Sequence, residues 1–270
     1  MISRNKGGLS NRIKSFVSCL HASDDARIYW PILDNYNKEH HILNCSFDRL
    51  FTNDVETKVF PTQNFYESHC LYINDSDCVP PNFNTFQSRC KSKPFTKTDR
   101  NNRNIDFMYN AIPEGIKHSY IKLFQYLTPV DSILNDINRF SQHFSDKTVS
   151  VHIRSWNRAN ENGRRNDLFN LKGYIDLMDK LPSEYNFFVC SDSQEVLDFF
   201  KKHPRFVNRI ITYDRKTPLD NSRDTPEGVI DDLTELYLCS RNNKIIGSHF
   251  STYTEVAWWL GGCTQDIQIV

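Results

Sequence analysis

The stretch Thr148-Val-Ser-Val-His-Ile-Arg154 decides the fold of the second half of this chain. Valine and isoleucine alternate with polar residues, which is the pattern of a β-strand with two different faces. The alternation places His152 and Arg154 on one face, opposite Val151 and Ile153. We therefore predict a strand whose carboxyl end presents a histidine and an arginine.

The residues that follow repeat one pattern, in which an apolar run, a loop and an amphipathic segment come in turn. Strands are expected at 186–190, 209–213, 244–247 and 267–270, and helices at 171–181, after Ser193, at 228–240 and at 252–260. Strands that alternate with helices of this length are joined by βα crossovers and form a parallel sheet. The sequence thus predicts a Rossmann-like lobe over residues 147–270.

The first half, residues 1–146, begins in the same way. A short strand at Ile2 is expected to lead through Gly7-Gly8 into an amphipathic helix, and a second strand is expected at 26–30. These elements again favour a parallel sheet.

The middle of the chain departs from this regularity. Residues 53–104 lack periodicity and are rich in Asn, Asp, Ser and Pro, which indicates loops with short strands. A largely helical stretch is expected at 114–144. The predicted fold class is therefore α/β, with two Rossmann-like lobes that carry parallel sheets, the N-terminal lobe being reduced and irregular.

The composition excludes several classes of protein. Lys+Arg and Asp+Glu both count 33, so a net charge of +0 gives no bulk attraction to nucleic acid. No apolar run reaches the roughly 18–20 residues of a membrane span, and the N-terminus lacks the apolar segment of a signal peptide. We expect a soluble, cytoplasmic protein with no membrane span and no nucleic-acid partner.

The 8 cysteines form no CxxC pair and have no histidine at zinc-binding spacing. Cys19, Cys190 and Cys239 lie in apolar patterns that are typical of core residues. Three others could pair in an oxidising compartment: Cys70, Cys78 and Cys90. Because no export signal is present, we expect reduced, structural cysteines.

Four turns carry residues suited to an anionic ligand. Gly7-Gly8-Leu9-Ser10-Asn11-Arg12 and Gly247-Ser248-His249-Phe250-Ser251-Thr252 each lead from a predicted strand into a helix, whose first N–H groups can bind phosphate. Ser191-Asp192-Ser193 and His152-Ile-Arg154 lie at two further strand ends, where ligands bind in open parallel sheets. Each turn also has a plainer interpretation, as a tight turn, a helix cap or an ion pair. Together they predict a cleft for a phosphorylated ligand.

These motifs, in this order, resemble the fucosyltransferase superfamily, which includes α1,2-, α1,6- and protein O-fucosyltransferases. The segments concerned are the Gly-Gly-Leu-x-Asn-Arg turn, the Val-His-x-Arg strand and the Ile-Ile-Gly-Ser-x-x-Ser-Thr turn before Ala-Trp-Trp. The resemblance spans the N-terminal turn and residues 148–262. It implies a GT-B fold with two facing lobes, and inverting, metal-independent transfer of fucose from GDP-fucose.

The resemblance also implies roles for individual residues. Arg154 would hold the β-phosphate and stabilise the departing GDP, with His152 beside it. Glu235 would accept hydrogen bonds from the guanine base, with Asp231 and Asp232 as alternatives. The other positions implied for donor binding are Gly8, Asn11, Arg12, Asp192, Ser248, Ser251 and Thr252.

The catalytic base stays open between three hypotheses. Glu161 lies in the loop after Arg154, where it could reach the cleft, and Asp167 is the alternative. A loose transition state with a strongly stabilised leaving group needs little early deprotonation, so the reaction could also proceed without a base. Family members often follow the HxR motif with a second arginine and an acidic residue, whereas Ser155-Trp156-Asn157 follows here.

The expected partners are a nucleotide sugar, held by the C-terminal lobe, and a glycan acceptor on the side of the N-terminal lobe. The resemblance implies no metal or other cofactor, and no DxD-type metal-binding motif stands at a predicted strand end. Asp75-Ser-Asp77 has that form but lies in the irregular segment. Two other functions stay open. The same fold could use another nucleotide sugar, or the protein could bind a glycan or nucleotide without catalysis.

Overall fold

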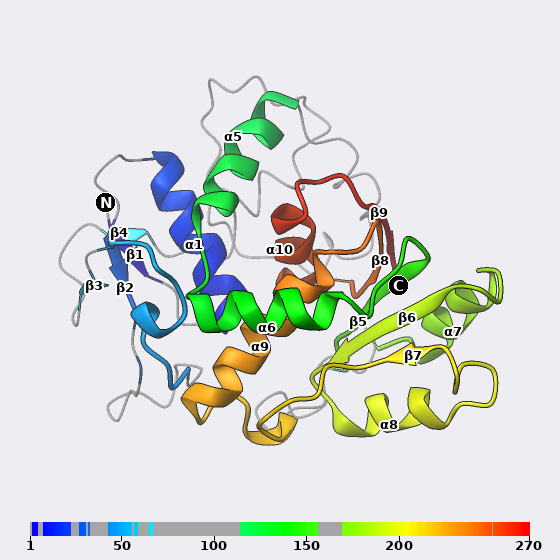
Figure 1. Cartoon of the computed structure of the whole chain (residues 1–270). Coiled ribbons are helices and arrows are strands. Elements are labelled where there is room, and N and C mark those ends of the chain that lie inside the picture. Colours follow the sequence, from blue (N-terminus) through cyan, green and yellow to red (C-terminus); the bar gives the residue numbers. More distant parts are fainter. Residues whose placement is uncertain are drawn as a thin grey trace. The chain divides into compact units, whose positions relative to one another are not determined.

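The computed structural model describes residues 2–4, 8–22, 27–30, 32, 43–55, 57–58, 65–66, 114–155, 169–249 and 251–270 (Figure 1). The chain divides into two compact units, Met1–Val130 and Asp131–Val270. Each unit contains a parallel sheet, so the expected α/β class is confirmed. The lobe boundary between residues 146 and 147 stays a prediction.

The second unit is built on five parallel strands. They are β5 (Thr148–Ile153), β6 (Asn186–Ser191), β7 (Ile210–Ile211), β8 (Lys244–Gly247) and β9 (Asp266–Ile269). Their order is β7-β6-β5-β8-β9, so the chain runs outward from β5 to β7 and then returns to the other side of β5. The carboxyl ends of β5 and β8 thus meet where the winding reverses, which is the usual place for ligands in open α/β sheets.

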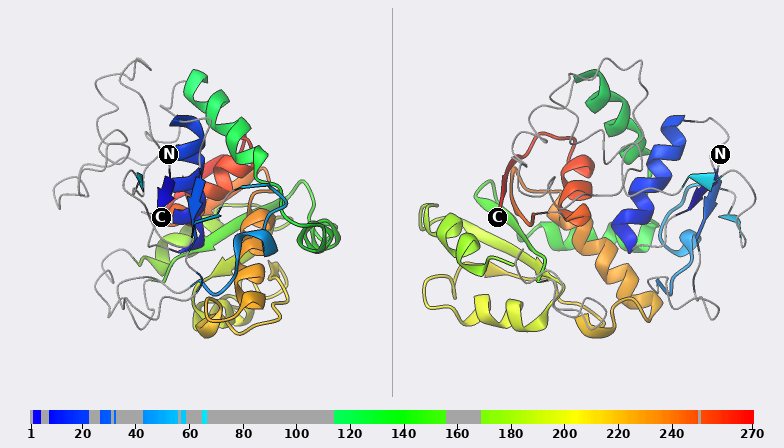
Figure 2. Two further views of the ribbon diagram at one scale, coloured as in Figure 1. Left: turned by 90° about the vertical axis from the view of Figure 1, so that its left-hand side faces the viewer. Right: turned by 180° about the vertical axis from the view of Figure 1, so that it is seen from behind.

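Helices cover both faces of this sheet (Figure 2). Helices α7 (Leu171–Asp179) and α8 (Gln194–Lys202) share one apolar core with Val149, Val151 and Ile153 of β5. Helices α9 (Pro226–Cys239) and α10 (Thr252–Leu260) pack on the opposite face, and α6 (Asp131–Ser141) packs against α9. The two faces of β5 therefore differ, as the alternation of its residues predicts.

The face of β5 toward α9 and α10 is polar although it is buried. The Ser150 hydroxyl donates to the Cys239 carbonyl at 2.8 Å and accepts from the Asn242 amide at 2.9 Å. These hydrogen bonds pair the polar groups inside the core. A buried polar group without a partner there would lower the free energy of unfolding by about 1–3 kcal/mol. The strand is thus anchored at its middle, ahead of the residues at its carboxyl end.

The first unit has a smaller sheet with the same kind of winding. Its strands β1 (Ile2–Arg4), β2 (Arg27–Tyr29), β3 (Thr57–Lys58) and β4 (Phe65–Tyr66) are parallel, in the order β3-β2-β1-β4. The helix α1 (Leu9–Ala22) follows β1 and is buried along most of its length. Strands of two or three residues agree with the reduced lobe that the sequence predicts.

An aromatic cluster forms much of the core of this unit. Phe47, in the short 3-10 helix η1 (Phe47–Arg49), lies edge-on to Phe16 and Trp30 at ring-centroid distances of 5.8 and 5.4 Å. Phe51 is tilted against Phe47 at 5.0 Å. Such contacts bury large apolar areas, which offsets the small size of the sheet.

The helical stretch expected at 114–144 is two helices, α5 (Glu114–Tyr126) and α6. They are separated at Pro129, which has no N–H to donate and cannot continue a helix. The backbone there pairs instead with the chain near Leu50: the Val130 N–H donates to the Leu50 carbonyl at 3.1 Å, and the Thr52 N–H donates to the Thr128 carbonyl at 2.9 Å.

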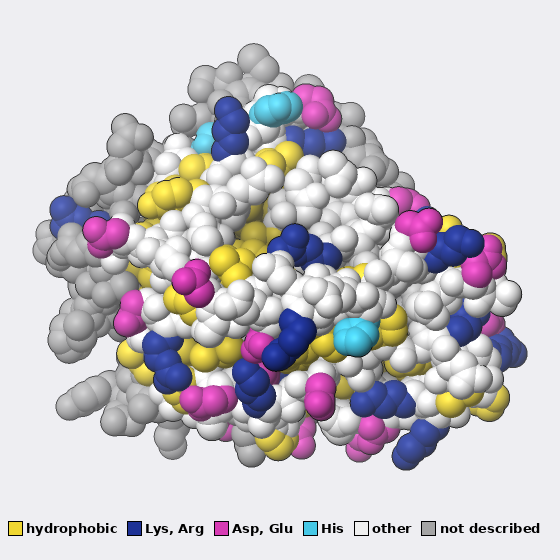
Figure 3. Space-filling model, viewed as in Figure 1, with side chains coloured by type: hydrophobic (Ala, Val, Ile, Leu, Met, Phe, Trp, Pro, Cys, Tyr) yellow, Lys and Arg dark blue, Asp and Glu magenta, His cyan; other side chains and the backbone are white. Residues whose placement is uncertain are grey.

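The surface agrees with the balanced composition. In Figure 3, Lys and Arg side chains lie among Asp and Glu side chains over the visible, described part of the molecule. Lys216 and Arg139 both pair with Asp136, at 3.0 and 2.6 Å. None of the helices in the described ranges is long and apolar enough to span a membrane.

The cysteines expected in apolar surroundings, Cys19, Cys190 and Cys239, are all buried. The group Cys70, Cys78 and Cys90 lies outside the described residues, and so does the Asp75-Ser-Asp77 motif.

Two glycines give a matched test of the packing around α9. A Cβ atom at Gly228, in the first turn of α9, would lie 2.1 Å from the Ser222 carbonyl oxygen. One at Gly115, in the first turn of α5, would meet no atom of the described residues within 4 Å. We expect Gly228→Ala to lower the free energy of unfolding by about 1–3 kcal/mol, because two backbones would have to separate. The control Gly115→Ala should be neutral or stabilise by up to about 1 kcal/mol, since alanine has the higher helix propensity. Urea unfolding measures both, and equal effects would contradict the contact.

Candidate functional site

The carboxyl ends of β5, β6 and β8 bring together three segments that are far apart in the sequence. Arg154 directly follows β5, Asp192 follows β6 and Ser248 follows β8. Because the strands are parallel, their carboxyl ends lie along one edge of the sheet. Hydrogen bonds connect all three residues, so the structure assembles the strand-end residues that the sequence singles out.

The hydroxyl group of Ser248 holds this edge together. It accepts a hydrogen bond from the Arg154 N–H at 2.6 Å and donates to the His152 carbonyl at 3.0 Å. It also lies 2.6 Å from the hydroxyl of Tyr174 on α7. A serine hydroxyl has one proton and two lone pairs, so these three contacts use its full capacity. The side chain of Ser248 is thus engaged within the protein.

The guanidinium group of Arg154 forms an ion pair with Asp192. Nη1 of Arg154 donates to Oδ2 of Asp192, and the Ser155 N–H donates to Oδ1 of the same carboxylate at 2.7 Å. The side chains are 15% and 7% exposed, so the pair is largely withdrawn from water but Arg154 still reaches the surface. One carboxylate therefore fixes both the direction of the arginine side chain and the backbone after it.

A helix-capping role for Asp192, the plainer interpretation of its turn, does not match these contacts. The cap of α8 is Ser193, whose side chain makes no capping hydrogen bond. Ser191 instead donates to the Ile153 carbonyl at 2.8 Å. Ser191, the last residue of β6, and Asp192, which follows it, therefore hold the end of β5.

His152 is buried and neutral. Its Nδ1 lies 2.8 Å from the hydroxyl of Thr254, which in turn accepts from the Ser248 N–H at 3.2 Å. The imidazole stacks on Tyr253 with ring centroids 4.4 Å apart. Burial lowers the pKa of His152 to about 3, so its ring carries no charge at neutral pH. His152 thus supports the strand end before Arg154 without adding positive charge, and its role in the reaction stays a prediction.

The N-terminus of α10 lies directly after β8 at the same edge. Ser251 caps the helix, its hydroxyl accepting from the Thr254 N–H at 3.4 Å, and Thr252 is the first helical residue. The first N–H groups of a helix carry partial positive charge and favour anions. Together with Arg154 they make this edge suited to a phosphate group.

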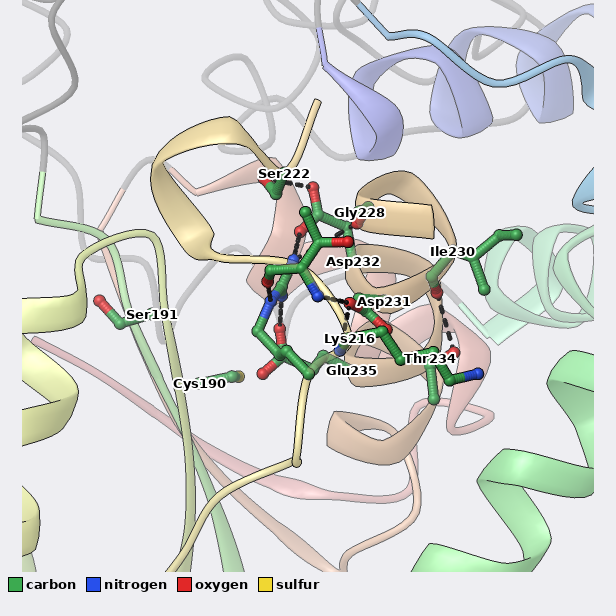
Figure 4. A network of polar contacts seen from close by, with 12 residues as sticks. Cys190, Ser191, Lys216, Ser222, Gly228, Ile230, Asp231, Asp232, Thr234 and Glu235 are labelled. Atoms are coloured by element: carbon green, nitrogen blue, oxygen red, sulfur yellow. Dashed lines mark hydrogen bonds and ion pairs between the residues drawn. The ribbon is translucent and has the colours of Figure 1, made fainter. Parts of the chain in front are cut away.

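Glu235, expected at the guanine base, lies in a buried network on α9 (Figure 4). It forms an ion pair with Arg215, and the two side chains are 4% and 8% exposed. Nη2 of the same guanidinium lies 2.7 Å from Oδ1 of Asp232. Burial raises the pKa of Glu235 to about 7, against the lowering effect of Arg215. One arginine therefore serves two carboxylates in a site nearly closed to water.

Asp231 binds the loop that carries this arginine. Its Oδ2 accepts from the backbone N–H groups of Lys216 and Thr217, at 2.8 and 2.9 Å, while its buried Oδ1 has no hydrogen-bond partner among the described residues. Burial raises the pKa of this carboxyl group. Asp231, Asp232 and Glu235 of α9 thus fix the loop before the helix, and the guanine contact implied for Glu235 stays a prediction.

The residues expected from the N-terminal turn lie in the first unit. Gly8 precedes α1, and its carbonyl accepts from the Arg12 N–H at 3.1 Å. Arg12 is buried, with its guanidinium carbon 5.3 Å from the centroid of the Trp30 ring. The buried Oδ1 of Asn11 has no hydrogen-bond partner among the described residues. The role in donor binding implied for Asn11 stays a prediction.

The candidate bases Glu161 and Asp167 lie outside the described residues, as does Phe250. Within the described ranges, no group of three or more His, Cys, Asp or Glu side chains is arranged to hold a metal ion.

Sequence reasoning missed three residues of this edge: Tyr174, Arg215 and Tyr253. Tyr174 and Tyr253 lie in helical patterns and look like ordinary core aromatics. Arg215 had a signal, because Asp231-Asp232-x-x-Glu235 places like charges three and four positions apart on a helix. Such pairs are destabilising without a cation, so a nearby Arg or Lys had to be sought.

The raised pKa of Glu235 gives a prediction with a definite sign. Between the ordinary value of 4.5 and about 7, the folded state keeps a proton that the unfolded state has lost, so this group makes stability fall as pH rises through that window. We expect Glu235→Gln to become more stable relative to the unmodified protein as the pH rises from 4.5 to 7. The difference between their free energies of unfolding should change by at most about 1.4 kcal/mol for each unit of the pKa shift.

Urea unfolding at several pH values measures this difference. Glu195→Gln, at an exposed position of α8, is the control for the change from Glu to Gln itself. A difference that stays constant with pH would mean that Arg215 keeps Glu235 ionised throughout.

Comparison with known proteins gives matches among solved structures. No family model and no curated protein matches the sequence. The α-1,6-fucosyltransferase NodZ co-crystallised with GDP matches with a TM-score of 0.54 and 18% identity, over 95% of this chain and 90% of that chain. NodZ from Bradyrhizobium matches with a TM-score of 0.53 and 18% identity over the same shares. NodZ soaked with GDP-fucose matches with a TM-score of 0.53 and 16% identity, over 96% of this chain and 91% of that chain. This chain therefore has the α/β fold of a fucosyltransferase, as its motifs led us to expect.

Proposed function

We propose that this protein is a glycosyltransferase that transfers fucose from GDP-fucose to a glycan hydroxyl group, with inversion and without a metal ion. The observation that carries the proposal is the position of Arg154. It lies at the carboxyl end of β5, beside β8, where the winding of the sheet reverses. Ion pairing with Asp192 and the hydrogen bond from its N–H to Ser248 define its place.

Two further observations support a diphosphate at this edge. The N-terminus of α10 adjoins Ser248 and offers N–H groups to an anion. NodZ, which shares the fold, has been crystallised with GDP and soaked with GDP-fucose. We therefore assign the nucleotide sugar to the C-terminal lobe, residues 147–270, and the glycan acceptor to the N-terminal lobe, residues 1–146.

In the proposed reaction, the acceptor oxygen attacks the anomeric carbon of fucose from the side opposite the diphosphate. A carbon–oxygen bond to the acceptor forms as the bond between the anomeric carbon and the β-phosphate oxygen breaks. The electron pair of the broken bond goes to GDP, and the guanidinium of Arg154 stabilises this charge in place of a metal ion. The proton of the acceptor passes to Glu161 or Asp167, or to solvent after the sugar has transferred.

The surroundings of the residues near Arg154 determine which roles these residues can take in the reaction. His152, with a pKa lowered to about 3 by burial, is too weak a base to take the acceptor proton at neutral pH. Asp192 competes with phosphate for the guanidinium, which carries five N–H donors and can bind more than one acceptor. Asn11 would place its amide near the donor phosphates or the acceptor.

A second function is favoured by one observation, the ion pair between Arg154 and Asp192. If that pair persisted with nucleotide bound, Arg154 would be a structural residue. The protein would then be a nucleotide- or glycan-binding protein without transferase activity. A related alternative keeps the activity but uses another nucleotide sugar.

Donor turnover separates these functions. Release of nucleotide should be measured with GDP-fucose, other GDP-sugars and UDP-sugars, and we expect turnover with GDP-fucose. Turnover with UDP-sugars alone would exclude fucose transfer. GDP binding without turnover of any donor, in the presence of a panel of glycan acceptors, would support the binding protein.

Substitution of Arg154 tests its role directly. We expect Arg154→Ala to lower kcat/KM for GDP-fucose by about 10²–10³-fold, the cost of losing one preorganised group that stabilises transition-state charge. Arg154→Lys keeps the charge opposite Asp192 and controls for a folding defect. Arg205→Ala is the matched control, since Arg205 pairs with Asp179 on the surface at 64% exposure. An Arg154→Ala variant as active as Arg205→Ala would contradict the proposal.

A further inference from the structure

We propose that Tyr174 is a positioning residue for Arg154, acting through the hydroxyl group of Ser248. This inference rests on the proposed function, because it assumes that Arg154 binds the diphosphate. Tyr174 lies on α7, where its ring belongs to the apolar core between that helix and the sheet. Only its hydroxyl group reaches the polar edge.

The direction of the hydrogen bond between Tyr174 and Ser248 follows from the single proton of the serine hydroxyl. The single proton of Ser248 Oγ goes to the His152 carbonyl at 3.0 Å, so Ser248 has none left for Tyr174. Tyr174 must therefore donate across the 2.6 Å between the two hydroxyl oxygens. The remaining lone pair of Ser248 accepts the N–H of Arg154 at 2.6 Å. A continuous chain thus runs from the Tyr174 hydroxyl to the backbone of Arg154.

This chain makes Tyr174 necessary for one orientation of Ser248. The serine hydroxyl can rotate about its Cα–Cβ bond among staggered positions. Ser248 Oγ accepts one hydrogen bond from the Tyr174 hydroxyl and another from the Arg154 N–H. Both bonds favour the same staggered position of the serine side chain. Burial raises the pKa of Tyr174 above its ordinary value, so the hydroxyl stays protonated and remains a donor at all working pH values.

The geometry also shows why a core tyrosine is used at this position. Ser248 is 4% exposed and Tyr174 2% exposed, so water does not compete for their hydrogen bond. A hydrogen bond in such surroundings is stronger and more directional than one in water. A small shift of Arg154 would matter, because displacement of a catalytic group by about 1 Å can cost about 100-fold in rate.

Tyr174→Phe removes one oxygen atom and leaves the packing of the ring unchanged. We expect kcat/KM for GDP-fucose to fall between about 10- and 100-fold, with the larger part in kcat. Tyr185→Phe is the matched control, because Tyr185 packs against the same apolar core and its hydroxyl makes no hydrogen bond among the described residues. That variant should keep the activity of the unmodified protein.

A double-mutant cycle separates positioning from a general loss of stability. If Tyr174 acts through the Arg154 side chain, its substitution should cost less than about twofold when made in the Arg154→Ala background. The Kd for GDP, measured by calorimetry, provides a second readout if the double variant is too slow to assay. A purely structural role predicts the same fold-loss in both backgrounds, and that result would overturn the inference.

The outcomes also distinguish this inference from the proposed function. A large loss with Arg154→Ala but additive effects of Tyr174→Phe would leave the proposed function intact and reject the positioning role. An Arg154→Ala variant with normal GDP affinity and normal turnover would reject both.

Discussion

The hydrogen bonds of one buried hydroxyl group, that of Ser248, connect the ends of β5 and β8 and determine the rest of the candidate site. The backbone N–H of Arg154, the carbonyl of His152 and the hydroxyl of Tyr174 all contact it. A parallel sheet alone brings strand ends to one edge but leaves their last residues free to turn. Saturating a buried hydroxyl removes that freedom, because any rotation would leave a polar group unpaired, at a cost of about 1–3 kcal/mol.

Among the described residues, two arginines are held by acidic side chains that are largely withdrawn from water. Arg154 pairs with Asp192, and Arg215 pairs with Asp232 and Glu235. A buried ion pair adds little net stability, yet removal of one partner is expensive because it leaves an unpaired charge. The two networks thus specify positions more than they stabilise the fold. Tyr253 lies between them, stacking on His152 and donating to the Asp232 carbonyl at 3.5 Å.

Periodicity predicted most of the second unit, since β8 and α10 begin and end where the sequence suggests. It overestimated the length of β7, which was expected at 209–213 and is Ile210–Ile211. This edge strand has one neighbour, and only these two residues pair with β6. The site was predicted less well. His152, Arg154, Asp192 and Ser248 follow from strand-end positions and the family motifs, but their partners do not. Tyr174 lies 74 residues from Ser248, and Arg215 lies 20 residues from Glu235. The spacing of acidic residues on α9 indicates that a cation is needed, but no local pattern tells which residue supplies it or that Tyr174 reaches Ser248.

A crystal structure with GDP would test the central claim, that the edge at β5 and β8 binds a diphosphate through Arg154. This account predicts the β-phosphate within hydrogen-bonding distance of the Arg154 guanidinium, close to the first N–H groups of α10. Nucleotide bound elsewhere, with the guanidinium of Arg154 still paired with Asp192, would contradict it.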